Sequence, residues 1–260
     1  MPQAYDPKTV ARFIADAHAQ RARYQNLPTD IAPKTVSEAY AAQEALRELW
    51  VPKYGPVAGR KIAVTTKIMQ ELMGIHAPIG GLIYQKCVHA SPATIRLAEF
   101  QHVVIEFELA VRLARALPAR ATPYTGAEAQ AAVGEAMAAY ELIEDRHAVY
   151  KDTDGLSLTA DNAWNAGIVL GPAVKLSPAR ELDGLATRLT SNGRDFRHGV
   201  TDDPMGALAW VANLAAERGE PLQAGMVVIT GSTIATLPIA PGERFKFEID
   251  GIGCVEMAAE

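Results

Sequence analysis

Cysteine and long hydrophobic runs are both scarce in this sequence. Its 260 residues include only two cysteines, Cys87 and Cys254, which lie far apart and lack the spacing of metal ligands. Neither a disulfide framework nor a zinc knuckle is therefore expected. No apolar stretch reaches the ~18 residues that a membrane-spanning helix requires, and the N-terminus lacks a basic region followed by an apolar one. We therefore expect a cytoplasmic protein without a membrane partner.

Basic clusters and the common nucleotide and hydrolase motifs are also absent. The 25 Lys and Arg residues are outnumbered by 30 Asp and Glu residues, which gives a formal net charge of −5. Because no basic run occurs, we expect no nucleic-acid partner. There is no GxxxxGK(S/T) phosphate loop, no GxSxG elbow and no HExxH zinc motif. The fragment Gly251-Ile252-Gly253 precedes no predicted helix, so it is not a dinucleotide-binding fingerprint.

Two amphipathic segments near the N-terminus indicate helices. Asp6 and Pro7 are typical of an N-cap followed by proline at the first helical position, and they predict a helix that ends near Asn26. Thr35 and Glu38 stand at capping-box spacing and predict the start of a second helix.

Beyond these helices the pattern favours strands. Short apolar stretches bounded by Gly, Pro or polar residues predict strands at 61–65, 103–113, 139–143, 168–170, 185–190 and 226–230. The pairs Asn192-Gly193 and Asp250-Gly251 are favoured in tight hairpins, so we expect antiparallel pairing. The pattern suits an α+β fold better than a regular βαβ alternation. We expect a helical segment over residues 1–55 and a β-rich catalytic domain over 56–260, together forming one continuous unit.

The strongest chemical signal is the run Glu106-Phe107-Glu108 within an apolar strand. Side chains at i and i+2 of a strand project from the same face, which places the two carboxylates about 7 Å apart. Neighbouring carboxylates repel one another, and a shared proton, a basic partner or a hard cation such as Mg²⁺ relieves the repulsion. The alternative is an exposed strand face with two solvated glutamates.

Two further segments could complete such a site. Glu141 lies in a predicted strand, and a third carboxylate beside a Glu-x-Glu pair gives a ligand set suited to Mg²⁺ or Mn²⁺. Lys61 stands where an apolar strand begins, and a lysine beside carboxylates can transfer protons, although an ordinary surface lysine is the alternative. Glu144 and Asp145 are expected to pair with Arg146 or to meet water.

Taken in order, several segments of this chain resemble the hydratase/decarboxylase branch of the fumarylacetoacetate hydrolase superfamily. The resemblance extends over most of the chain and rests on the shared order and spacing of these segments. The matching segments are GRKI at 59–62, TTK at 65–67, IEFE at 105–108, ELI at 141–143, LTADN at 158–162, NAG at 165–167, LAWVANL at 208–214, AG at 224–225 and TGS at 230–232.

The resemblance implies an α+β fold with a mixed β-sandwich or β-roll core, N-terminal helices, bound Mg²⁺ (or Mn²⁺), a small 2-oxo acid substrate and a homo-oligomer. It also implies roles for individual residues. The metal ligands would be Glu106, Glu108 and Glu141; the catalytic residues Lys61 and Asp161; and the residues near the substrate Thr66, Ile79 and Ser232.

The implied activity is that of a lyase that adds water to a 2-hydroxy-2,4-dienoate of the 2-keto-4-pentenoate type. The product would be a 4-hydroxy-2-oxo acid, formed through an enolate that the cation stabilises. Many hydratases of the family carry Pro-Asp-Tyr-Gly where this chain has Pro78-Ile79-Gly80-Gly81. Related decarboxylases have an apolar residue at the position of Ile79, which keeps 4-oxalocrotonate-type decarboxylation open. Hydrolysis of an acylpyruvate C–C bond and a non-catalytic binding protein on the same fold are further alternatives.

Overall fold

Two capped helices form the N-terminal part of the computed structural model, which describes residues 4–177 and 180–260. Helix α1 (Pro7–Ala19) begins at Asp6, whose carboxylate accepts hydrogen bonds from two backbone N–H groups of the first turn. Helix α2 (Val36–Tyr54) begins at Thr35, and the capping box with Glu38 is present. The predicted end of α1 near Asn26 is wrong, because Arg21 adopts a left-handed backbone conformation (φ 53°) that an α-helix cannot continue.

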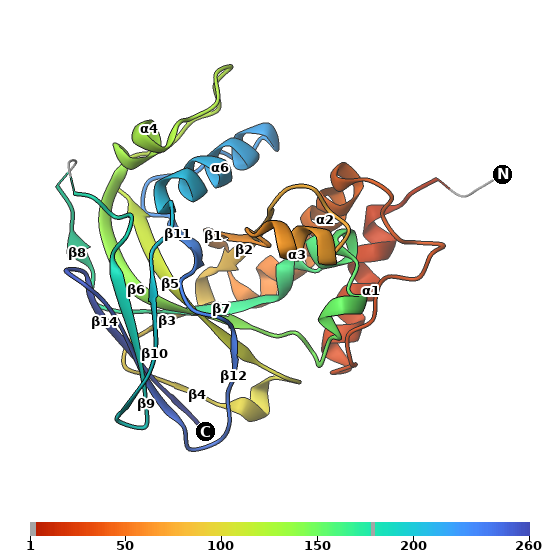
Figure 1. The fold of residues 1–260 in the computed structure, drawn as a ribbon. Helices are drawn as coiled ribbons and strands as arrows, with labels where there is room; N and C mark the ends of the chain where they lie inside the picture. Colours follow the sequence, from red (N-terminus) through yellow and green to blue (C-terminus); the bar gives the residue numbers. More distant parts are fainter. Residues whose placement is uncertain (1–3, 178–179) are drawn as a thin grey trace.

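The N-terminal helices pack against the β-rich part of the chain. Ile14 of α1 and Trp50 of α2 share a buried apolar cluster with Leu82 and Tyr84 of strand β2 (Ile79–Tyr84). Figure 1 shows these helices on one side of the sheets. The division of the chain at residue 55 remains a prediction.

A mixed nine-stranded sheet forms the centre of the molecule. Its strand order is β2-β1-β11-β5-β6-β7-β3, with β12 beside β5 and β8 beside β6. Strand β1 runs parallel to β11, whereas β5 runs antiparallel to both β11 and β6. The remaining strands of this sheet are β1 (Val57–Ala63), β3 (Val88–Ala90), β5 (Val104–Leu113), β6 (Val133–Ile143), β7 (Asn165–Leu170), β8 (Val174–Lys175), β11 (Val227–Ser232) and β12 (Leu237–Pro238).

A second sheet of five strands packs against the first. Its order is β10-β9-β13-β14-β4, and its strands are β4 (Ala93–Ile95), β9 (Ala186–Ser191), β10 (Arg194–Val200), β13 (Arg244–Ile249) and β14 (Gly253–Ala259). Both predicted hairpins are confirmed, because β9 pairs with β10 and β13 with β14 in antiparallel fashion.

Aromatic side chains fill the space between the two sheets. The ring of Phe247 from β13 lies 5.5 Å from Phe107 of β5 and 6.3 Å from Tyr140 of β6, measured between ring centroids. The Tyr140 hydroxyl donates a hydrogen bond to the carbonyl of Val255 in β14. Burial of such large apolar surfaces is the main stabilising contribution to a sandwich core. The predicted α+β fold with a mixed β-sandwich core is confirmed.

The other helices lie along the sheets and connect their strands. The α-helices are α3 (Lys67–Leu72), α4 (Gly126–Gln130), α5 (Gly155–Ala160) and α6 (Pro204–Glu217), and the 3₁₀ turns are η1 (Gln85–Cys87), η2 (Leu97–Glu99), η3 (Tyr150–Asp152) and η4 (Asn162–Trp164). Within the ranges that the structure describes, none of the helices is long and apolar enough to cross a membrane.

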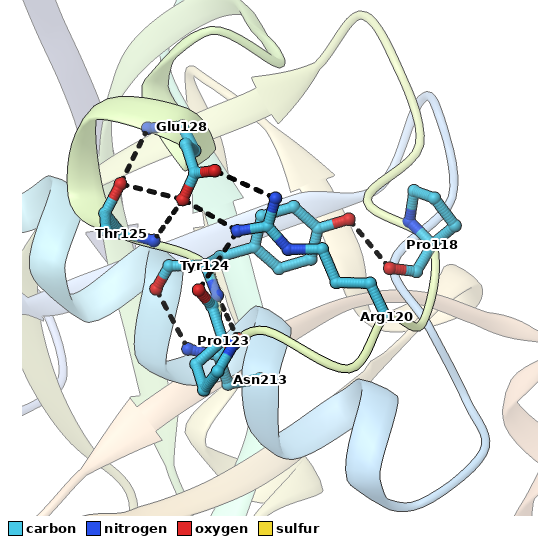
Figure 2. Close-up of polar contacts among 7 residues, drawn as sticks. All are labelled: Pro118, Arg120, Pro123, Tyr124, Thr125, Glu128 and Asn213. Atoms are coloured by element: carbon cyan, nitrogen blue, oxygen red, sulfur yellow. Dashed lines mark hydrogen bonds and ion pairs between the residues drawn. The ribbon is translucent and has the colours of Figure 1, made fainter.

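Polar contacts attach the loop before α4 to α6 (Figure 2). Arg120 forms an ion pair of 2.7 Å with Glu128, and its guanidinium carbon lies 3.8 Å from the centroid of the Tyr124 ring. The backbone of Tyr124 exchanges two hydrogen bonds with the side-chain amide of Asn213 in α6. The loop is therefore fixed at both the helix that follows it and the helix that it covers.

Candidate active site

Three glutamates converge because of the register between β5 and β6. Glu106 of β5 lies directly opposite Glu141 of β6 in the antiparallel pair. Glu108 follows Glu106 by two residues and so projects from the same face of β5. One carboxylate oxygen from each residue lies within 4.8 Å of the others, and both Glu108 and Glu141 are completely buried. The alternative of an exposed strand face with solvated glutamates is therefore wrong.

Burial makes this cluster of carboxylates unfavourable on its own. Burial raises the pKa of Glu108 well above its ordinary value, and the charges of Glu141 and Glu106 raise it further. Burial also raises the pKa of Glu141 to about 7, against the opposing effect of Lys61. A positive charge placed between these carboxylates would reverse both shifts, because it stabilises the ionised form.

The donor atoms fit a divalent cation. Each carboxylate accepts a hydrogen bond from an uncharged group; the donors are Thr236 Oγ1 to Glu106 (2.6 Å), Gly231 N to Glu108 (2.5 Å) and Asn165 Nδ2 to Glu141 (2.8 Å). Glu108 Oε1 and Glu141 Oε2 are buried and have no hydrogen-bond partner among the described residues. Buried carboxylate oxygens without donors are the ligands that Mg²⁺ and Mn²⁺ prefer.

Gly231 contributes to this geometry through its backbone. Its φ of 113° is a conformation that residues with a Cβ rarely adopt. This conformation turns its N–H toward Glu108 at the end of β11. Glycine is therefore favoured at this position by its backbone conformation.

Lys61 extends from β1 into the same cluster. Its side chain is only 1% exposed, and its Nζ lies 2.6 Å from Glu141 Oε1. The same ammonium donates a hydrogen bond of 3.0 Å to the carbonyl of Ala163. Gly81 of β2 pairs with Lys61, and a Cβ at Gly81 would lie 2.9 Å from Lys61 Cγ. The lysine therefore needs a glycine beside it, and the alternative of a surface lysine is wrong.

A left-handed turn presents the Ala163 carbonyl to Lys61. Asn162, Ala163 and Trp164 have φ values of 53°, 47° and 57°, and each such non-glycine residue costs about 1 kcal/mol or more. The Asn162 side chain holds the turn on β2, since it accepts a hydrogen bond of 2.7 Å from Leu82 N and donates one of 2.9 Å to Leu82 O. Our sequence reasoning assigned no role to Asn162, although it lies within the LTADN segment.

A cavity of about 450 Å³ opens over this site. Lys61 and Glu106 line it together with the predicted residues Thr66 and Ser232. Thr66 caps helix α3 by accepting a hydrogen bond from Met69 N. Ser232 Oγ accepts from Phe107 N (2.9 Å) and donates to the carbonyl of Ile234 (2.7 Å). The structure thus brings the three glutamates, Lys61, Thr66 and Ser232 together.

Two of the five predicted catalytic and substrate-binding residues, Asp161 and Ile79, do not line this cavity. Asp161 is 2% exposed, and its carboxylate is paired with Arg146 and with His18 Nε2, at 2.7 Å from the latter. Ile79 is buried in an apolar cluster that includes Leu158 and Trp164, behind the cavity wall. Neither side chain reaches the carboxylate cluster directly.

The residues at the end of β6 pair differently from the prediction. Arg146 does not pair with Glu144 or Asp145 but with Asp161. Asp145 instead lies 2.6 Å from His102 Nδ1. Of the two predicted alternatives for Glu144 and Asp145, pairing with Arg146 is wrong, because the Arg146 guanidinium pairs with Asp161 instead.

Comparison with known proteins places this chain in a family. Residues 67–258 match the family described as "Fumarylacetoacetate (FAA) hydrolase C-terminal". The chain is 30% identical over 221 residues to 2-keto-4-pentenoate hydratase of Burkholderia vietnamiensis, covering 84% of this chain and 83% of the relative. It is 27% identical over 255 residues to 2-oxo-hept-4-ene-1,7-dioate hydratase of Escherichia coli, covering 95% of each.

A solved structure agrees over nearly the whole chain. The structure of 4-oxalocrotonate decarboxylase from Pseudomonas putida G7, complexed with magnesium and adipate, superimposes with a TM-score of 0.88 at 25% sequence identity. The match covers 98% of this chain and 97% of that protein. Together with the sequence matches, it shows that the chain belongs to the hydratase/decarboxylase branch of the fumarylacetoacetate hydrolase superfamily.

Proposed function

We propose that this protein is a divalent-metal-dependent lyase that hydrates a 2-hydroxy-2,4-dienoate to a 4-hydroxy-2-oxo acid. One observation carries the proposal: a buried lysine lies 2.6 Å from one of three convergent carboxylates beneath a cavity. The names of the hydratase relatives support the same reaction class. The substrate would be a small 2-oxo acid in its dienol form, and the protein is expected to act as a homo-oligomer.

Glu106, Glu108 and Glu141 would hold Mg²⁺ or Mn²⁺. When bound, the cation supplies a Lewis acid for the keto and carboxylate oxygens of a 2-oxo acid. The carboxylates bring the negative charge that retains it, and the hydrogen bond from Gly231 N orients Glu108.

Lys61 would move the proton. Its Nζ is fixed between Glu141 and the Ala163 carbonyl, so it can hold a proton at a defined place above the carbon skeleton of the substrate. Protonation of a 2-hydroxy-2,4-dienoate on carbon gives a keto acid that accepts water at C4. The Lys61 side chain is only 1% exposed, so this proton is held away from bulk water.

We assign Asp161 a positioning role, because it does not line the cavity. Its carboxylate joins His18 of α1 to Arg146 after β6, and it immediately precedes the turn that offers the Ala163 carbonyl to Lys61. Asp161→Asn should lower kcat while leaving KM and the affinity for Mg²⁺ nearly unchanged. An equal loss of Mg²⁺ affinity would show that Asp161 supports the whole fold instead.

Ile79 favours a second candidate, decarboxylation of a 4-oxalocrotonate-type acid. Where many hydratases of the family carry an acid, this chain has a side chain buried in an apolar cluster. An assay with Mg²⁺ that follows both the ultraviolet absorbance of the diene and CO₂ release separates the two reactions. Loss of absorbance without gas supports hydration, whereas stoichiometric gas supports decarboxylation.

The alternative that this protein has the same fold but no catalytic activity can be tested by measuring ligand binding alone. Oxalate mimics the enolate of a 2-oxo acid, so calorimetric titration of oxalate with Mg²⁺ should show tight binding to an enzyme. A protein that binds neither Mg²⁺ nor oxalate would contradict the proposed function.

A further inference from the structure

We propose that the cavity selects 2-oxo acids whose far end is neutral and apolar, and that it discriminates against dicarboxylic acids of the same chain length. This inference deepens the proposed function and rests on it. The hydratase relatives include both kinds. The name of one specifies a monocarboxylate, and the name of another specifies a 1,7-dioate, which is a dicarboxylate.

The charges at the base of the cavity leave no cation for a second carboxylate. Glu106, Glu108 and Glu141 contribute three negative charges when ionised, and a divalent cation together with Lys61 balances them. The keto-acid end of any substrate brings one further negative charge. A second carboxylate would therefore enter a site that already has no excess positive charge.

The upper wall of the cavity is apolar. Its side chains come from α3, β6, η3, α5 and η4; they are Met69, Met73, Ile143, Tyr150, Leu158 and Trp164. The Tyr150 hydroxyl already donates a hydrogen bond of 3.2 Å to Asp145. Among the described residues that line the cavity, Lys61 is the sole side chain with a positive charge.

On one side, a second pocket that contains two aspartates adjoins the cavity. The two spaces share Thr65, Thr66 and Ser232 among their lining residues. Beyond them, the second pocket is lined by the exposed carboxylates of Asp202 and Asp203. A long apolar tail could extend toward this pocket, whereas an anionic tail would meet like charges.

On the other side, an adjoining surface pocket shares Tyr150 and Thr236 with the cavity and is lined by the basic residues Arg23, His102 and His147. Arg23 there is exposed and donates its Nε–H to the carbonyl of His147. His102 is paired with Asp145, which offsets its positive charge when it is protonated. Contacts of exposed charges contribute little because water screens them, so this pocket does not replace a cation inside the cavity.

Calorimetry with two inert acids tests the selectivity without turnover. 2-Oxohexanoate and 2-oxoadipate share the same keto-acid head and six-carbon chain, and they differ only in a methyl or a carboxylate at C6. In the presence of Mg²⁺, 2-oxohexanoate should bind at least about tenfold more tightly, since burial of an unpaired carboxylate is costly. Equal or tighter binding of 2-oxoadipate would overturn the inference while leaving the proposed function intact. Failure of both acids to bind would overturn the proposed function as well.

Matched variants on helix α3 locate the selectivity. Met69→Arg adds a cation to the apolar wall and should reduce the preference for 2-oxohexanoate by about tenfold or more. Leu72→Arg adds the same charge to the same helix at a residue that is 41% exposed and is not among the residues lining the cavity, so its preference should equal that of the wild type. Identical shifts in both variants would overturn the inference, because a general electrostatic effect would then suffice.

Arg23→Ala tests the surface pocket. If this cavity excludes anionic tails, the substitution should leave the ratio of the two affinities unchanged. A loss of 2-oxoadipate binding specific to Arg23→Ala would show that dicarboxylic acids are recognised through Arg23, and it would contradict the proposal.

Discussion

Lys61 Nζ lies 2.6 Å from Glu141 Oε1, and both side chains are almost completely removed from water. Such a pair does not by itself stabilise a protein, because removing two charges from water costs about as much as their attraction returns. The burial of this pair is therefore better explained by a role in the reaction than by a contribution to stability. The proton of this lysine is held beside the carboxylate cluster, at the base of the cavity.

Glu106→Gln should remove metal binding with little change to the fold. Glu106 is the partly exposed member of the trio, so the amide is tolerated there, but it lacks the negative charge that holds a cation. Loss of a residue that only hydrogen-bonds to a metal ligand weakens metal binding by about 10–100-fold. Because Glu106→Gln changes a ligand itself, we expect at least about 100-fold weaker Mg²⁺ binding by calorimetry. Unchanged affinity would contradict the assignment of the ligands.

Lys61→Met should reduce turnover by about 10²–10⁴-fold, the usual contribution of a positioned acid or base. Metal binding should persist, because the three carboxylates remain. The measurement is kcat for diene loss, with calorimetry of Mg²⁺ as the control. Turnover within a few fold of the wild type would exclude Lys61 as the proton carrier.

The stability of the metal-free protein should fall as the pH rises. Burial raises the pKa of Glu141 from its ordinary value of 4.5 to about 7, so the folded state binds a proton more tightly than the unfolded state does. The stabilisation is present below pH 4.5 and is lost as the pH rises through about 7. Melting curves recorded in EDTA should show this loss. Glu141→Gln, which cannot titrate, should show a smaller dependence over the same window.

Mg²⁺ should abolish that loss and should bind more tightly at higher pH. The cation competes with the proton on Glu141, so its affinity rises until the carboxylate is fully ionised. Calorimetry at pH 6 and pH 8 measures the difference. Affinity that is independent of pH over this interval would contradict the raised pKa.

Asn162→Gly should lower kcat without affecting Mg²⁺ affinity. Glycine keeps the left-handed backbone but removes both hydrogen bonds to Leu82, at a cost of about 1–3 kcal/mol in stability. The turn then holds the Ala163 carbonyl less firmly against Lys61. Asn192→Gly is the matched control, since Asn192 is also left-handed and lies in the β9–β10 hairpin. Equal effects of both substitutions on kcat would contradict a positioning role.

Local features of the chain were predictable from the sequence. The caps at Asp6 and Thr35 depend on residues two or three positions apart, and the Asn192-Gly193 hairpin depends on two adjacent residues. These signals arise from the backbone conformations that each residue prefers. For the same reason the Glu106-x-Glu108 pair could be placed on one face of a strand.

Features set by register and burial could not be predicted from local patterns. The pairing of Glu106 with Glu141 joins residues that are distant in the chain; local patterns indicated only that Glu141 could complete the site, and the family resemblance implied that the three carboxylates meet. The burial of Lys61 depends on the missing side chain of Gly81 across β1 and β2. Asp161 lies in one of the segments that carry the resemblance, but its pairing with Arg146 and His18 depends on how α1 docks.

The residues that line the two sides of the cavity come from different kinds of secondary structure. The carboxylates and the lysine stand on three strands of a hydrogen-bonded sheet, whose spacing leaves them little freedom to move. Met69 and Met73 of the opposite wall belong to a six-residue helix and its cap. Exchanging α3 with that of a related enzyme would therefore alter which molecules are admitted while the reaction itself is conserved, so new specificities could evolve on this scaffold without rebuilding its chemistry.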